Sequence, residues 1–346
     1  MISFESDYIE GAHPLILESF QKHNSDQVPG YGFDVFTAHA TELIREAAGC
    51  SDADVYFLVG GTQTNQVVID TMLQPYEGVV APETGHIAVH EAGAVEYTGH
   101  KILTVPSHDG KMDARELRAL VKGFYDDQNH EHMVFPGLIF LTFPTELGTI
   151  YTRKELQEIR AVADEFKLPV YVDGARLGYG LMSSECDLTF REFAELVDVF
   201  YIGGTKVGAL CGEAVVFKKG FMPAHFATRV KQHGAMIAKG RLLSQQFETL
   251  FTDDLYFDIA SHAIRLADKL KAGFAAKGYE FYIDSPTNQQ FFVFSKEEAE
   301  YLAKEFRFSF WEKLDEKRTV YRFVTSWATK EENVDRLLAY LPEHRS

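Results

Sequence analysis

The chain has 346 residues, of which 46% are hydrophobic and 25% charged, as expected for a globular protein with a large buried core. Its formal net charge is −17, which argues against a nucleic-acid-binding surface. The three cysteines, Cys50, Cys186 and Cys211, form no Cys-x-x-Cys pair, so neither a disulfide framework nor a structural zinc site is expected. Because the first residues lack a signal-peptide pattern and no apolar stretch approaches roughly 20 residues, we expect a cytoplasmic protein without a membrane anchor.

The first two thirds of the sequence alternate between short apolar runs and segments of helical periodicity. This alternation is typical of an α/β protein with a mostly parallel sheet covered by helices. Continuous apolar runs suit strands that are buried on both faces. In chain order the pattern predicts helices at 37–50, 65–73 and 152–166, and strands at 55–59, 78–82, 101–105, 137–143, 169–172, 197–202 and 214–217.

The pattern changes after residue 217. Long helices are predicted at 226–251 and 254–277, then short strands at 280–283, 290–294, 306–311 and 319–325, and a final helix at 330–341. We therefore expect a large domain at 1–253 and a small α+β domain at 254–346. The first residues of the chain are candidates for packing with the small domain.

Two strand ends carry the side chains that pyridoxal phosphate chemistry requires. One apolar run ends at Asp173, followed by Arg176, and a second run about thirty residues later ends at Lys206. The lysine can bind the cofactor aldehyde, and the aspartate can keep the pyridine nitrogen protonated, so that the ring accepts electrons. Each residue alone is more often a solvated lysine or a strand-end cap, and the argument depends on the pair.

Gly60, Gly61 and Thr62 stand between a predicted strand and a predicted helix. Glycine lets the backbone approach an anion, and the free amides of a helix start attract it. The run matches neither a Walker loop nor a dinucleotide fingerprint. It therefore favours a compact phosphorylated cofactor over ATP or NAD, although such turns are commonly structural.

His86 follows the strand predicted at 78–82 and could stack on an aromatic cofactor or transfer protons. A surface or capping histidine is the more frequent case. His90 lies four residues further on, but there is no His-Glu-x-x-His pattern and no evident third ligand. We therefore expect no metal site.

These residues resemble the threonine aldolase branch of the pyridoxal phosphate enzymes with the aspartate aminotransferase-type fold. The resemblance covers nearly the whole chain. Its specific part is Asp-Gly-Ala-Arg at 173–176 followed by Thr-Lys at 205–206. The other matching segments are 4–7, 11–14, 60–62, 86, 91–94, 145–149, 203–204 and 322–326.

The resemblance implies a role for each matching position. Lys206 should carry the cofactor, Asp173 should pair with its ring nitrogen, and His86 should stack on the ring. The remaining cofactor contacts are expected from Gly60, Gly61, Thr62, Arg176 and Thr205. The substrate carboxylate should be held by Ser6, Arg176 and Arg322, which suits bidentate capture by guanidinium groups. Tyr31 matches a loop that completes the site, from a neighbouring subunit.

The implied activity is cleavage of L-threonine, L-allo-threonine or another β-hydroxy-α-amino acid to glycine and an aldehyde, by a carbon–carbon lyase. His86 is the candidate base, with His90 or Glu91 nearby. The alternatives are β-elimination or transamination on the same fold, and a non-catalytic cofactor-binding protein. Departures from the family pattern, such as Thr-Phe-Pro-Thr-Glu at 142–146, leave open which substrate is preferred and which stereochemistry at its β-carbon. The resemblance also implies a homo-oligomer, which is at least a dimer and is commonly a tetramer in this family.

Overall fold

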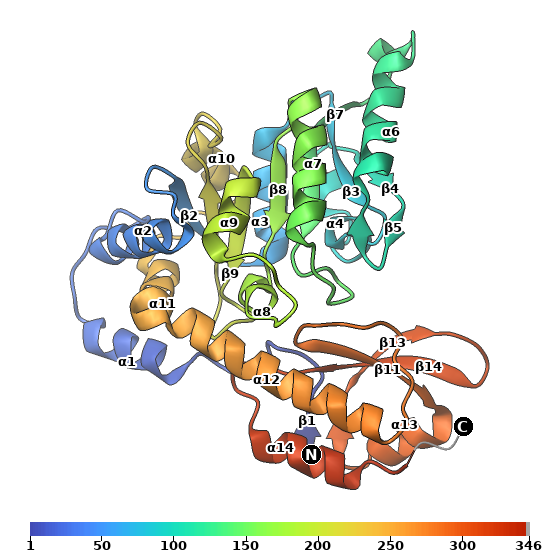
Figure 1. Cartoon of the computed structure of the whole chain (residues 1–346). Helices are drawn as coiled ribbons and strands as arrows, with labels where there is room; N and C mark the ends of the chain where they lie inside the picture. Colours follow the sequence, from blue (N-terminus) through green and yellow to red (C-terminus); the bar gives the residue numbers. More distant parts are fainter. Residues whose placement is uncertain (344–346) are drawn as a thin grey trace.

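The computed structural model describes residues 1–343, and its centre is a seven-stranded sheet (Figure 1). The strand order is β2-β10-β9-β8-β7-β3-β4. Only β10 runs antiparallel to its neighbours. The strands are β2 (Asp54–Leu58), β3 (Glu77–Pro82), β4 (Ile102–Val105), β7 (Phe135–Thr142), β8 (Val170–Asp173), β9 (Val199–Gly203) and β10 (Glu213–Phe217). The α/β class with a mostly parallel sheet is confirmed, and each of these strands ends within two residues of its predicted bounds.

Helices bury both faces of this sheet, which explains the continuous apolar runs. In β9, Phe200 and Ile202 join one hydrophobic core, while Val199 and Tyr201 join a second core on the other face. The first core includes α2 (Val35–Ala48), α6 (Ala114–Asp126), α7 (Arg153–Phe166) and α9 (Phe190–Leu196). The second includes α3 (Gly61–Met72), α4 (His86–Val89), α5 (Ala94–Tyr97) and α10 (Phe226–Gln232).

The last third of the chain forms a separate small sheet with its own core (Figure 1). Its antiparallel order is β11-β14-β13, and Phe274 stacks on Phe292 with ring centroids 3.8 Å apart. The elements are α12 (Leu255–Ala276), β11 (Gln289–Ser295), α13 (Lys296–Leu302), β13 (Ser309–Lys313), β14 (Arg318–Val324) and α14 (Glu331–Tyr340). The division at 253/254 falls in the turn η2 (Thr252–Asp254) and stays a prediction.

The beginning of the chain packs against this last third. Strand β1 (Ile2–Ser3) pairs in parallel with β12 (Phe306–Arg307), and Phe4 belongs to the same core as Phe323. The remaining elements are α1 (Pro14–His23), β5 (Ser107–His108), β6 (Lys111–Met112), η1 (His130–His132), α8 (Leu177–Leu181) and α11 (Arg241–Phe251). No helix within residues 1–343 is both long and apolar enough to span a membrane.

Three predicted elements are wrong. The helix expected at 226–251 is two helices, because the chain leaves the helical conformation at Gly234, where φ is +68°, and resumes it only at Arg241. The segment 280–283 is not a strand and makes a single bridge, from Phe281 to Phe292. The strand expected at 306–311 is divided between β12 and β13, which belong to different sheets.

Candidate active site

A cavity of about 210 Å³ lies beyond the carboxyl ends of the parallel strands. Ligands bind at this edge in open α/β sheets, because the loops that follow neighbouring strands meet there. Eight predicted site residues line the cavity together, namely Gly60, Gly61, Thr62, His86, Asp173, Arg176, Thr205 and Lys206. Segments about 150 residues apart in sequence therefore converge on one space.

Lys206 follows β9, and the Tyr179 hydroxyl fixes its backbone by donating a 2.7 Å hydrogen bond to the Lys206 carbonyl oxygen. Burial, followed by the positive charge of Arg176, lowers the pKa of the Lys206 amine below its usual value. A lower pKa increases the neutral fraction of the amine, which is the nucleophilic form. The lysine is therefore suited to covalent bonding with an aldehyde.

Asp173 ends β8 and is held by three donors. Tyr201 Oη and the Ala175 amide both donate to Oδ1, at 2.5 and 3.0 Å, and Asn65 Nδ2 donates to Oδ2 at 2.8 Å. The Tyr171 hydroxyl in turn donates to Asn65 Oδ1 at 2.8 Å, which fixes the amide orientation. This carboxylate is thus immobilised toward the cavity, as a partner for a ring N–H must be.

The same asparagine links Asp173 to His86. Asn65 Nδ2 also donates to Glu91 Oε1 at 2.7 Å, and that oxygen lies 2.7 Å from His86 Nδ1. Burial lowers the pKa of His86, but the hydrogen bond to Glu91 and the charge of Asp173 outweigh it, so the net pKa is raised. His86, Glu91 and Asp173 offer donor atoms within 4.8 Å of one another. Asn65 bridges the two carboxylates of this trio, and the expected absence of a metal stays a prediction.

The turn before α3 provides a candidate anion-binding site. Gly60 precedes the helix, and no side chain caps its first amides. A Cβ atom on Gly61 would lie 3.0 Å from the Tyr201 hydroxyl, so glycine keeps this side of the cavity open. Free amides at the start of a twelve-residue helix, with the Thr62 hydroxyl beside them, fit a phosphate group.

Two arginines form a positive cluster beside the cavity. Arg176 lines the cavity and forms a bidentate ion pair with the buried Asp7. Arg322 donates to Gln289 Oε1 at 3.0 Å, while its Nε is buried without a partner. Burial, then repulsion from Arg176, lowers the pKa of Arg322 to about 10. A bound anion would stabilise the charged guanidinium and so counteract both the burial and the repulsion.

Thr205 lines the cavity, whereas Ser6 and Arg322 are not among the residues that line it. Ser6 Oγ is buried and lacks a hydrogen-bond partner, and Ser6 stands between Glu5 and Asp7, which contact Arg322 and Arg176. The Thr205 hydroxyl donates to Glu213 Oε1 at 2.8 Å and accepts from the Gly212 amide at 3.0 Å. Only one lone pair of Thr205 therefore remains for its predicted contact with a cofactor.

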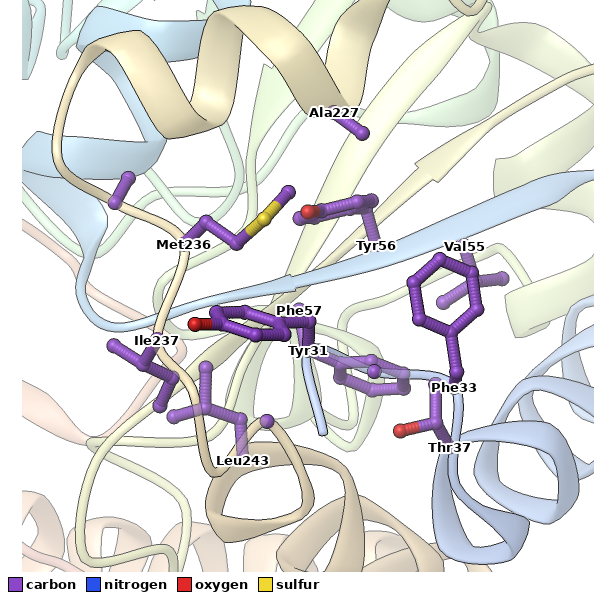
Figure 2. A pocket seen from close by; sticks show the side chains of 13 residues that line it. Tyr31, Phe33, Thr37, Val55, Tyr56, Phe57, Ala227, Met236, Ile237 and Leu243 are labelled. Carbon is purple, nitrogen blue, oxygen red and sulfur yellow. The ribbon is translucent and has the colours of Figure 1, made fainter. Parts of the chain in front are cut away.

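Tyr31 is not brought to this cavity. It lines a second, apolar cavity of about 200 Å³ together with Phe33, Tyr56, Met236 and Leu243 (Figure 2). The Tyr31 ring is half exposed, and Lys231 Nζ lies 4.9 Å from its centroid. Its predicted contribution to the site of a neighbouring subunit stays a prediction.

Fold and site define a class of protein. The buried lysine, the immobilised carboxylate and the open helix start fit pyridoxal phosphate, the cofactor of aminotransferase-like enzymes. The aspartate aminotransferase of Thermus thermophilus shares the fold, with a TM-score of 0.71 at 14% identity over 98% of this chain and 90% of that chain. The model of the family described as "Beta-eliminating lyase" matches residues 16–297. The chain belongs to this family, and the fold class inferred from sequence is confirmed.

The similar proteins include several threonine aldolases. A threonine aldolase structure from Leishmania major is 40% identical, with a TM-score of 0.95, and the match covers 99% of this chain and 98% of that one. A low specificity L-threonine aldolase of a Pseudomonas species is 30% identical over 97% of this chain and 96% of its own length. One from Saccharomyces cerevisiae is 27% identical over 82% of this chain and 74% of its own length. The resemblance drawn from the sequence motifs is thereby confirmed.

The sequence indicated no role for four residues of the site, namely Asn65, Glu146, Tyr201 and Glu213, although Glu146 lies in a segment that matches the family. Asn65 is buried in α3 together with Thr64 and the apolar residues Val67, Val68 and Ile69. Glu213 is an acid at the first position of the buried strand β10. A buried polar residue in an apolar pattern is a signal of function, but their partners lie far away in sequence.

Proposed function

We propose that this protein is a pyridoxal phosphate-dependent aldolase that cleaves L-threonine, L-allo-threonine or a related β-hydroxy-α-amino acid to glycine and an aldehyde. The observation that carries the proposal is the convergence of Lys206, Asp173 and an open helix start on one cavity, with two arginines beside it. The similar threonine aldolases support the choice of a carbon–carbon lyase reaction.

The chain's own residues orient the substrate. Arg176, Arg322 and Ser6 would hold the α-carboxylate, since the two guanidinium groups lie close enough to repel each other and Ser6 stands between their contacts Glu5 and Asp7. Holding the carboxylate fixes the direction of the bonds at Cα relative to the cavity. Such positioning can contribute several kcal/mol, by order of magnitude, to lowering the barrier.

The cofactor would be held at both of its ends. Gly60, Gly61 and Thr62 would bind its phosphate, Asp173 would accept from its ring N–H, and His86 would stack on its ring. Lys206 would bond to its aldehyde. When bound, pyridoxal phosphate supplies an electron sink for the pair released at Cα.

A product assay tests the proposal. The purified protein, loaded with pyridoxal phosphate, is incubated with L-threonine, L-allo-threonine and phenylserine, and glycine, aldehyde, ammonia and keto acid are each quantified. Equal amounts of glycine and aldehyde are expected. Ammonia with a keto acid would instead assign the β-elimination that the family description names, and an absence of all products would reject the proposal.

We further propose that the protein is a homo-oligomer, which is at least a dimer and, from the family resemblance, a tetramer. We also propose that it is located in the cytoplasm. The apolar cavity around Tyr31 supports the assembly, because Phe33 and Tyr31, which line it, are 82% and 46% exposed. Clustered exposed apolar side chains of this kind mark contact surfaces. The mass of the protein in solution tests the proposal.

A further inference from the structure

Glu146 is a buried acid in the active-site cavity to which no role has been assigned. It lines the cavity together with His86 and Lys206. Its Oε1 accepts a 2.8 Å hydrogen bond from the Thr142 hydroxyl, at the end of β7. Its Oε2 is buried and has no hydrogen-bond partner. A buried carboxyl oxygen without a partner is costly, and because Glu146 lines the cavity, a ligand bound there could satisfy it.

Hydrogen bonds hold the loop that carries Glu146. The Thr145 amide donates to the Thr149 carbonyl oxygen at 2.9 Å, and the Gly148 amide donates to the Thr145 carbonyl at 2.9 Å. The Thr149 hydroxyl is 2.7 Å from that of Thr145 and donates to the Asp109 carbonyl at 2.7 Å. Glu146 therefore occupies a fixed position, as a group that transfers protons must.

We propose that Glu146 is the catalytic base that removes the proton from the β-hydroxyl group of the substrate. This inference rests on the proposed aldol cleavage and deepens it. The O–H bond breaks, its proton goes to Glu146 Oε2, and its electron pair forms the second carbon–oxygen bond of the aldehyde. The Cα–Cβ bond breaks at the same time, and its pair stays with the glycine fragment until Cα takes up a proton. The reaction needs no oxidant or reductant.

The charge environment supports this role. Burial raises the pKa of Glu146 to about 7, while the Thr142 hydrogen bond and His86 oppose the rise and Asp173 adds to it. A base works best with a pKa near the working pH. His86, the other candidate, has a raised pKa and is hydrogen-bonded to Glu91. The charged or titratable groups around Glu146 are His86, Tyr151, Asp173, Arg176, Lys206 and Glu213.

The test uses the cofactor-loaded protein and its Glu146→Gln variant. The amide keeps the shape and can accept from Thr142 but cannot take a proton. The kcat should fall by about 100-fold or more, and the acidic limb of the wild-type kcat–pH profile, near pH 7, should disappear. The cofactor absorbance should be unchanged. The matched control is Glu116→Gln, because Glu116 also has a buried, unpaired Oε2 but lies outside the cavity.

A second variant and a direct titration remain informative if Glu146→Gln folds poorly. Because the Thr142 hydrogen bond lowers the pKa of Glu146, Thr142→Val should move the acidic limb to higher pH. The ¹³C chemical shift of the Glu146 carboxyl carbon should titrate near pH 7, independently of turnover.

Three outcomes would overturn the inference and leave the aldolase proposal intact. They are glycine formation at the wild-type rate by Glu146→Gln, an acidic limb that Thr142→Val does not move, and a limb that vanishes in His86→Phe but persists in Glu146→Gln. A wild-type protein that binds the cofactor but forms no glycine would instead reject the proposed function itself.

Discussion

Asp7 and Arg176 form a bidentate ion pair, with Nε–Oδ2 and Nη2–Oδ1 distances of 2.7 and 3.0 Å. The Asp7 carboxylate is fully buried and also accepts a 2.9 Å hydrogen bond from Asn288. The pair connects the first residues of the chain to the loop after β8. It therefore sets the direction of the guanidinium that is proposed to bind substrate.

Removing this carboxylate should destabilise the protein. In Asp7→Asn the Arg176 charge remains buried without its counter-ion, which should lower the free energy of unfolding by about 3 kcal/mol. Denaturant unfolding measures this change. Asp113→Asn is the control, because Asp113 pairs with the exposed Arg115 and its loss should have no measurable effect. Equal stabilities of Asp7→Asn and wild type would contradict this account.

The same pair predicts a pH dependence. Burial alone would raise the pKa of Asp7, but Arg176 and Lys206 outweigh it, so the pKa lies below 3.8 in the folded protein. Stabilisation by a group with a lowered pKa is present above its unfolded pKa and is lost as the pH falls through its folded pKa. The difference between wild type and Asp7→Asn should therefore be constant from about pH 5 to pH 8 and shrink toward about pH 3.

Lys206 should be the point of cofactor attachment. Borohydride reduction of the protein with pyridoxal phosphate should leave the added mass on the peptide that contains Lys206, because its amine has a lowered pKa and faces the cavity. Lys206→Ala should take up no covalent label. Lys219→Ala, which changes an exposed lysine paired with Asp52, should label as wild type does. Label on any other lysine would disprove the assignment.

Asn65 should matter for cofactor affinity although its side chain is absent from the cavity lining. Asn65→Ala removes the amide that bridges Glu91 and Asp173, and leaves two buried carboxylate oxygens with one donor fewer. A cost of about 1–3 kcal/mol is typical for such a loss, so the Kd for pyridoxal phosphate should rise by about 5- to 150-fold. Fluorescence titration measures it, with the exposed Asn129→Ala as control. An unchanged Kd would argue that the network has no such role.

The pH dependence of stability that Glu213 causes should have the opposite sign to the one that Asp7 causes. Burial raises the pKa of Glu213 to about 8, against hydrogen bonds from Thr205 and the Gly204 amide. The folded protein then holds a proton that the unfolded chain releases above 4.5, so wild type loses stability as the pH rises through this window. Glu213→Gln removes this contribution, and its stability relative to wild type should increase between about pH 5 and pH 8. The loss of the Gly204 hydrogen bond changes the stability of the variant by an amount that does not depend on pH. Parallel curves of stability against pH for wild type and Glu213→Gln would refute the raised pKa.

The apolar surface near Tyr31 should mediate assembly. Phe33→Asp places a charge on a ring that is 82% exposed at the rim of the apolar cavity, and burying that charge in an interface is costly. Light scattering should show a lower molar mass for this variant. Phe310→Asp, a similarly exposed phenylalanine of the small sheet, should keep the wild-type mass. A monomeric wild-type protein would exclude the proposed assembly.

The central sheet could be predicted from the sequence because its strands are buried on both faces and read as continuous apolar runs. The glycine turn at 60–61, Asp173 and Lys206 could be predicted as one site because strand ends of a parallel sheet meet at one edge. The break at Gly234 was missed because the apolar residues on both sides keep helical spacing. Glu146, Asn65 and Glu213 were missed because their roles depend on partners such as Asp173 and Lys206, which only the tertiary structure brings near.

The parallel pairing of β1 with β12 has a consequence for biosynthesis. Residues 5–7 reach Arg176 and Arg322 only when β1 has docked against residues 306–307. A ribosome synthesises residues 2–3 well before residues 306–307, because it adds roughly 5–20 residues per second. A nascent chain that has emerged only as far as Lys206 would therefore contain the reactive amine but not the complete carboxylate-binding site. Ribosome-bound fragments should have no catalytic activity until the small sheet has folded.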